Sequence, residues 1–194
     1  MRKQVCAIVA MALGIFIAPT LLSALYISHP AEPNAISINA STINFILPGG
    51  LQVRCDMCTW RVASGKNEIV IDAGSIGCVT NCGLLDNLTS PELMSMIANA
   101  AITEAIVRGY IQYGESCNGA ESTRVYLAAC VQRSGTGVGT YFTVCDPNSF
   151  CVRKYNLCRM FPSGTPQVNL LGAESPGCPA QGSCQSTCTQ AGID

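Results

Sequence analysis

Cysteine content is the feature that most constrains what this chain can fold into, because 13 of its 194 residues are cysteine. Cys6 lies inside an apolar stretch near the start of the chain, and the others follow that stretch. An even number of cysteines in an exported segment indicates a framework of disulfides, whose connectivity the sequence leaves open. We predict that disulfides form among Cys55, Cys58, Cys78, Cys82, Cys117, Cys130, Cys145, Cys151, Cys158, Cys178, Cys184 and Cys188.

The beginning of the chain supports export. Arg2 and Lys3 precede residues 5–27, a run of 23 residues without any charge. As a helix this run would extend about 35 Å, enough to cross a hydrocarbon core of about 30 Å, and it is longer than the apolar centre of a cleaved signal peptide. We predict an uncleaved signal anchor that spans the lipid membrane, with residues 28–194 on the extracytoplasmic side because basic residues stay in the cytoplasm. The alternative is cleavage, which would give a secreted protein.

A buried helix is the clearest element of the remaining chain. The pattern predicts it from Pro91 to Arg108, with Thr89 and Glu92 in capping-box spacing before it and Gly109 as its stop. Most of its side chains are apolar, which is typical of a helix buried on most sides. The polar residues form one narrow stripe of Glu92, Ser95, Asn99 and Thr103.

Strands are predicted on both sides of this helix. Residues 37–47 are rich in β-formers and end at a Pro-Gly-Gly turn, and residues 51–57 alternate between apolar and polar types. A turn at 64–67 predicts a hairpin, followed by a loop over 74–83. Residues 121–146 predict a second hairpin with a glycine-rich tip, in which Cys130 and Cys145 would lie close enough to bridge. Residues 147–161 read as a loop that Cys151 and Cys158 could tie.

These elements predict an α+β fold, a small antiparallel sheet of hairpins packed on one buried helix and cross-linked by disulfides. The chain divides into a signal anchor (1–27), a tether with the first strand (28–50), the α+β ectodomain (51–161) and an irregular tail pinned by cysteines (162–194).

One cluster of basic and aromatic residues is a candidate for binding a protein partner. It lies on the predicted loop and consists of Arg153, Lys154, Tyr155, Arg159 and Phe161. Such residues on a constrained loop are typical anchors of protein interfaces. The alternative is an ordinary solvated loop.

Several chemistries have no visible support in the sequence. The net charge is −1 and no basic arm is present, which argues against a nucleic-acid partner. The single histidine, His29, lies at the predicted membrane boundary, where it is poorly placed for a catalytic triad or a metal site. We therefore predict a protein that is not an enzyme, without catalytic residues, cofactor, metal or small-molecule substrate.

One alternative centres on Cys55 and Cys58. Their Cys-x2-Cys spacing, followed by Cys78 and Cys82, would suit a zinc site or a thiol-disulfide redox pair in another setting. The residues on either side of Cys55 and Cys58 read as strand, whereas a reactive dithiol usually lies at a helix amino terminus.

Low charge gives the preferred functional hypothesis. Residues 28–194 contain only 9 basic and 12 acidic side chains, about half the usual charged fraction. A lone soluble domain normally carries more charge, so we expect neighbouring proteins to cover much of this surface. The hypothesis is a structural or interaction role in a surface, envelope or membrane-containing virion assembly. A secreted disulfide-rich binding module is the alternative.

Overall fold

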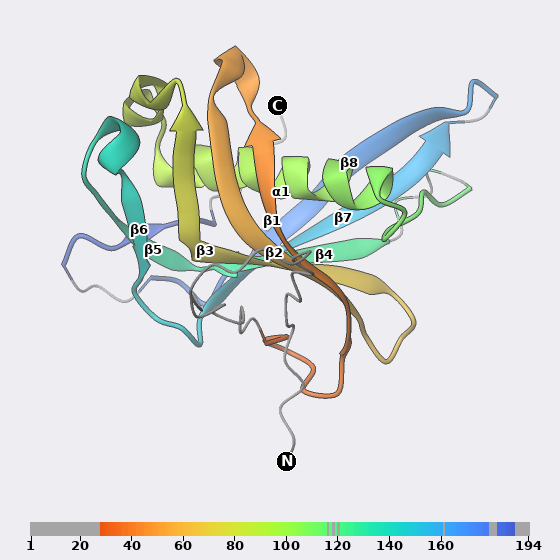
Figure 1. Cartoon of the computed structure of the whole chain (residues 1–194). Coiled ribbons are helices and arrows are strands. Elements are labelled where there is room, and N and C mark those ends of the chain that lie inside the picture. The colour runs from red at the N-terminus through yellow and green to blue at the C-terminus, as the bar shows by residue number, and fades with distance from the viewer. Residues whose placement is uncertain are drawn as a thin grey trace, which may run out of the picture.

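The structure is a computed structural model that describes residues 28–115, 117, 119, 121–160, 162–178 and 182–188. It is an α+β fold in which one helix, α1 (Ser90–Val107), lies across one face of a mixed β-sheet (Figure 1). Among these described residues, no helix is long and apolar enough to cross a membrane. The predicted anchor over residues 5–27 lies outside the described residues.

Six strands form the main sheet in the order β1-β2-β3-β4-β7-β8. Neighbouring strands are antiparallel except β3 and β4, which run parallel through a short contact. The strands are β1 (Ile36–Ile46), β2 (Gln52–Arg61), β3 (Asn67–Thr80), β4 (Thr123–Ala128), β7 (Phe150–Met160) and β8 (Thr165–Glu174). The helix supplies the long connection that two parallel neighbours require.

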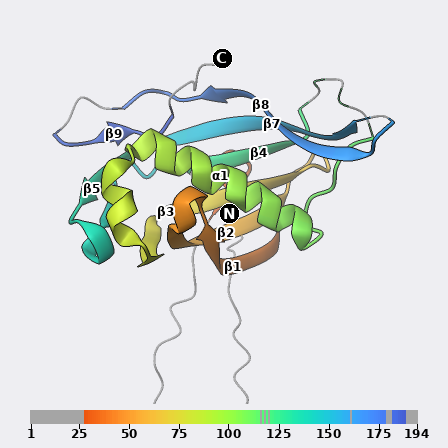
Figure 2. The ribbon, with the colours of Figure 1, turned by 90° about the horizontal axis from the view of Figure 1, so that it is seen from above.

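A second, smaller sheet joins the middle of the chain to its C-terminal part. Its order is β6-β5-β9, built from β5 (Cys130–Ser134), β6 (Tyr141–Val144) and β9 (Gln185–Ser186). Three short 3-10 helices complete the described elements: η1 (Pro48–Gly50), η2 (Cys82–Asn87) and η3 (Gly137–Gly139). Figure 2 shows β5 and β9 beside the start of α1.

The helix prediction is confirmed at both ends. Thr89 caps α1, its hydroxyl accepting from the Glu92 N–H while the Glu92 carboxylate accepts from the Thr89 N–H, as in a capping box. Gly109 follows the helix at a positive φ of 74°, a conformation that favours glycine. The helix is buried against the sheet through residues such as Ile97 and Ala101.

Two hydrophobic clusters lie on opposite faces of the main sheet. The larger one fills the space between α1 and the sheet and includes Val53, Ile71, Leu127 and Leu157. The smaller one, here called the outer cluster, lies on the other face and comprises Ala35, Cys58, Trp60, Val62, Val70 and Tyr126. Residues 28–35, in red and orange in Figure 1, run along this outer face.

The predicted antiparallel sheet and the predicted loop over 74–83 were wrong in part. The sheet is mixed, and β3 continues through Gly74 and Gly77 to Thr80. The two glycines read as loop signals, but pairing with β2 up to the Gln52–Thr80 position holds this segment extended. Pairing between distant segments therefore overrides the local glycine preference here.

The predictions of a loop over 147–161 and an irregular tail over 162–194 were also wrong in part. The first segment contains β7, a strand of 11 residues, and the second contains β8, which forms the edge of the sheet. Pro166 and Gly172 in β8 are typical of loops, yet a proline is tolerated near the start of an edge strand.

Candidate functional site

Five disulfides connect ten of the predicted cysteines within the part of the chain that the structure describes. They are Cys78–Cys82, Cys117–Cys158, Cys130–Cys178, Cys145–Cys184 and Cys151–Cys188. Four of them join residues 37 to 48 positions apart, and three of those end in the C-terminal segment. This confirms the prediction that cysteines pin the end of the chain to the sheet.

Two of the suggested pairings were wrong. The Cys145 N–H donates to the Cys130 carbonyl at 3.1 Å, so these residues are neighbours across β5 and β6, yet each side chain bonds to the C-terminal segment instead. Cys151 and Cys158 lie seven positions apart on one extended strand, which separates them by roughly 23 Å at about 3.3 Å per residue. A disulfide requires Cα atoms about 5.5 Å apart, so this strand cannot be tied to itself.

The geometry around Cys55 and Cys58 contradicts the zinc and dithiol alternatives. The two residues are three positions apart on β2, so their side chains point to opposite faces of the sheet. Cys55 packs in the core under α1, whereas Cys58 belongs to the outer cluster. Cys78 and Cys82, the other two suggested zinc ligands, are joined to each other. The four sulfur atoms therefore do not meet.

The prediction of a disulfide at Cys55 was also wrong, because Cys55 is a buried free thiol. Burial raises the pKa of this thiol well above its usual range, and the nearby carboxylates of Asp56 and Asp72 raise it further. A thiol in this state is neither nucleophilic nor accessible.

We expect Cys55 to resist alkylation in the folded protein. Iodoacetamide applied for hours at pH 8 should leave Cys55 unmodified, and the same reagent in 6 M guanidinium should modify it fully, because only unfolding exposes the sulfur. Mass spectrometry of the Cys55 peptide gives the measurement. Rapid modification in the folded protein would show that the thiol is reactive.

The predicted partner-binding residues alternate between the two faces of β7. Arg153 and Tyr155 point toward α1 and are buried, whereas Lys154 lies on the opposite face and bonds to Glu174 of β8. Arg159, near the end of the strand, lies 5.7 Å from the ring centre of Tyr113. Phe161 lies outside the described residues. The structure therefore does not bring these residues together as one exposed patch, and the binding prediction was wrong for Arg153 and Tyr155.

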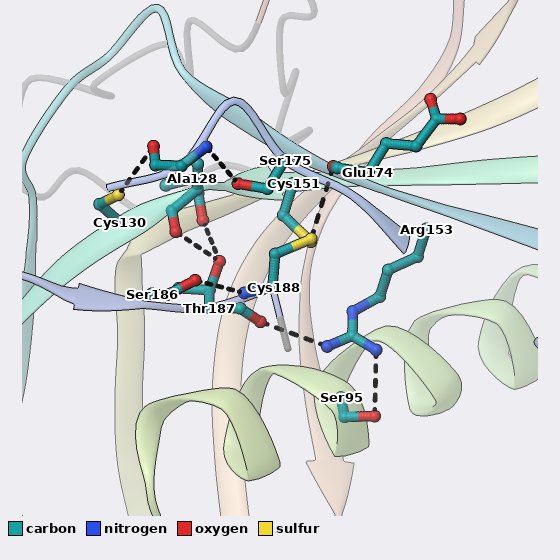
Figure 3. Close-up of a disulfide and its surroundings, with 12 residues drawn as sticks. Ser95, Ala128, Cys130, Cys151, Arg153, Glu174, Ser175, Ser186, Thr187 and Cys188 are labelled. Atoms are coloured by element: carbon teal, nitrogen blue, oxygen red, sulfur yellow. Dashed lines mark hydrogen bonds between the residues drawn. A yellow bond between two sulfur atoms is a disulfide. The ribbon is translucent and has the colours of Figure 1, made fainter. Parts of the chain in front are cut away.

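Arg153 instead joins three parts of the fold (Figure 3). Its guanidinium donates to the Ser95 hydroxyl on α1 at 3.2 Å and to the Thr187 carbonyl in the C-terminal segment at 3.2 Å. The side chain is fully buried, and none of the carboxylates in the described residues forms an ion pair with it. Its Nε atom has no hydrogen-bond partner. A buried charge of this kind is costly, so its neighbours must hold it in place.

The polar stripe of α1 explains how this arginine is accommodated. Ser95 bonds to Arg153, and one turn later Asn99 accepts a hydrogen bond from the Tyr155 hydroxyl at 3.0 Å. Burial raises the pKa of Tyr155 to about 12, so the phenol stays protonated and donates. The stripe that the sequence presented as a solvent-facing feature therefore faces β7.

The C-terminal segment is held at this point by further contacts. Thr187 is buried, and its hydroxyl bonds to the carbonyls of Ala128 and Ala129. Gln185 accepts from the Ser90 hydroxyl at the start of α1 at 2.6 Å. The disulfide between Cys151 and Cys188 lies beside these contacts (Figure 3). The whole arrangement fastens the chain end to the helix and the sheet.

On the outer face, His29 forms a second buried polar group. Its Nε2 lies 2.9 Å from a carboxylate oxygen of Glu68, and its Nδ1 accepts from the Glu32 N–H at 2.9 Å. Because Nδ1 is an acceptor, the neutral ring carries its proton on Nε2 and donates it to Glu68. The ring also contacts the edges of Trp60 and Tyr126. We call this group the His29 clip, because it holds residues 28–35 against the sheet.

Both ring nitrogens of His29 are engaged, so the clip presents no free base to a substrate. Burial alone would raise the pKa of Glu68, but hydrogen bonds from His29 and Tyr126 and the positive charge of Arg124 together lower it below its usual value. Glu68 therefore stays ionised at neutral pH.

The His29 clip predicts an acid-dependent loss of stability. A carboxylate whose pKa is lowered in the folded state stabilises the fold above its unfolded pKa, near 4.5, and this contribution is lost as the pH falls through the lower folded value. We expect Glu68→Gln to cost about 2 kcal/mol at pH 7 and progressively less below about pH 4. Denaturant unfolding of both proteins from pH 3 to pH 7 gives the test. Parallel stability curves would contradict the assignment.

The sequence did not indicate either buried polar group. The His29 clip joins residues 39 positions apart, so no local pattern announces it. Arg153 stands in a period-two pattern with Cys151, Tyr155 and Leu157, which was visible, but a charged residue on that face argued against burial.

Comparisons with models of protein families, with curated proteins and with solved structures found no match.

Proposed function

We propose that this protein is a non-enzymatic, membrane-anchored ectodomain with a structural or interaction role in a surface, envelope or membrane-containing virion assembly. The single observation that carries the proposal is a disulfide-fixed fold with about half the usual density of charge. Disulfides of this number are typical of extracytoplasmic proteins. Low surface charge is unusual for an isolated soluble domain and suits one whose surface meets neighbours.

The polar groups inside the fold also support a structural role. The guanidinium of Arg153 and the imidazole of His29 are both committed to neighbouring residues. Each fastens a segment near one end of the described chain to the sheet. Large apolar side chains on the surface, among them Ile36, Ile46, Val107, Val138 and Tyr141, are suited to protein contacts.

Membrane fractionation combined with sizing tests the proposal. The full chain, produced with an export-competent amino terminus, should remain in the membrane pellet after an alkaline carbonate wash. Its mass should include Met1, and protease added outside should reach residues 28–194. After extraction in mild detergent, the particle should contain several copies or partner chains rather than one chain of 20.4 kDa.

Two outcomes would contradict it. Release into the medium with a mature terminus between residues 24 and 29 would favour the secreted alternative. A particle that stays monomeric at all concentrations, in membranes and in detergent, would remove the assembly role.

A further inference from the structure

Charged side chains are missing from both edges of the main sheet. Residues 33–53, which include all of β1, contain none, and residues 160–173, which include β8 up to its last residue, contain none. The charges are carried by inner strands: Arg54, Asp56 and Arg61 on β2, Glu68 and Asp72 on β3, Arg124 on β4, and Arg153, Lys154 and Arg159 on β7. Natural sheets usually place charges on their edges to prevent strand addition. This sheet has the opposite distribution.

Both edges are also long. β1 has 11 residues and β8 has 10, whereas protected edge strands are typically short. Ile36 and Ile46 on β1 are 60% and 72% exposed, and Val168 on β8 is 37% exposed. Each edge strand presents backbone N–H and C=O groups that its single neighbour in the sheet leaves unpaired. Such a row is a template for another strand.

We propose that copies of this chain join edge to edge, with β1 of one copy pairing with β8 of the next to form a continuous sheet. The proposal rests on the assembly role above and specifies how the copies meet. Within one sheet β1 and β8 run in the same direction, as the order and orientation of the six strands require. A second copy shifted along the sheet, without being turned over, therefore brings its β1 alongside β8.

The positions of α1 and Val168 favour this pairing over one between two copies of β8. Val168 lies opposite Leu157, on the face that carries α1, and it is only partly covered. The helix packs against β1 at the other edge. The arriving β1 would therefore bring a helix and apolar cover to Val168, whereas a second β8 would bring neither.

The arrangement also agrees with anchoring in one bilayer. Residues 28–35 lie on the face opposite α1 and are held there by the His29 clip (Figure 1). Copies joined edge to edge without inversion keep these segments on the same side. A contact of this heterologous kind leaves one β1 and one β8 free, so it propagates into a row or a lattice.

Single charges on the two edges test the proposal. Asn44 on β1 and Asn169 on β8 are both exposed, and Asn44→Glu places its carboxylate opposite Arg54 within the same chain, which favours folding. We expect Asn44→Glu and Asn169→Glu each to weaken self-association of the detergent-extracted full chain at least about tenfold, because an unpaired charge would be buried at the junction. Gln132→Glu, on the central strand of the small sheet, is the matched control and should associate like the wild type.

Mixing the variants gives the sharpest outcome. Asn44→Glu leaves β8 free and Asn169→Glu leaves β1 free, so an equal mixture should form 1:1 heterodimers and stop there, as measured by mass photometry and native mass spectrometry. Hydrogen exchange should show slowed amides in β1 and β8 of the assembled wild type, and unchanged core protection in each variant shows that it is folded.

The possible failures are distinguishable. If the wild type assembles and both edge variants assemble equally well, the edge junction is wrong while the proposed function stands. If only Asn169→Glu loses assembly and the mixture gives no heterodimer, two β8 strands pair instead and the proposal is overturned. A wild type that never assembles overturns the assembly role and the edge junction together.

Discussion

Full reduction of the disulfides is expected to unfold this protein at 25 °C. Four disulfides close loops of 37 to 48 positions, and the loop-entropy relation gives roughly 4 kcal/mol for each. The sum for the four exceeds the stability of about 5–15 kcal/mol that a typical domain possesses. Circular dichroism and the fluorescence of Trp60, which is buried in the oxidised fold, should both change to unfolded values after reduction. A reduced protein that keeps both signals and unfolds cooperatively would contradict this account.

Paired substitutions resolve the contributions. Cys130→Ala with Cys178→Ala opens a loop of 48 positions and should cost about 4 kcal/mol, whereas Cys78→Ala with Cys82→Ala opens one of 4 positions and should cost about 2 kcal/mol. Denaturant unfolding measures both. Equal losses would show that loop entropy is not the main source of stabilisation.

Loss of the Arg153 side chain is expected to produce the largest effect of any single substitution outside the cysteines. Arg153→Ala leaves a cavity under α1 and removes the hydrogen bonds to Ser95 and Thr187, which should cost about 3 kcal/mol. Arg153→Met keeps most of the volume and removes a buried charge that no described carboxylate pairs, so it should cost less than half as much. Lys154→Ala, on the exposed face of the same strand, is the control and should cost under about 1 kcal/mol.

Hydrogen exchange distinguishes the fastening role of Arg153 from simple core packing. In Arg153→Ala the amides of residues 182–188 should exchange faster than those of the distant β1–β2 hairpin, because the guanidinium holds the Thr187 carbonyl directly. Uniform acceleration across the fold would show that the arginine only fills space.

The helix was predictable from sequence because its signals are local. The Thr89–Glu92 capping box, the apolar length and Gly109 all lie within the helix or next to it, and each has the predicted role. The cysteine framework was predictable in kind, since five disulfides are present, but not in its pairing. Pairing depends on which strands become neighbours, and that information is spread over the whole chain.

The strands that were missed share one cause. β3, β7 and β8 each contain residues that oppose a strand locally, respectively Gly74, Arg153 and Pro166. Their extended form comes from pairing with distant partners and from burial under α1, and short sequence windows do not record either. The buried polar groups escaped for the same reason, since their contacts join residues 34 to 58 positions apart.

Peptide mapping of the native protein under non-reducing conditions tests the central claim most directly, which is that sulfur cross-links hold the sheet, the helix and the chain end together outside the cytoplasm. Thiols are blocked in intact cells before lysis, and the linked peptides are then sequenced. We predict bonds joining Cys117 to Cys158, Cys130 to Cys178, Cys145 to Cys184 and Cys151 to Cys188, with Cys55 unlinked. Free thiols at these eight positions, or a bond between Cys130 and Cys145, would contradict the account.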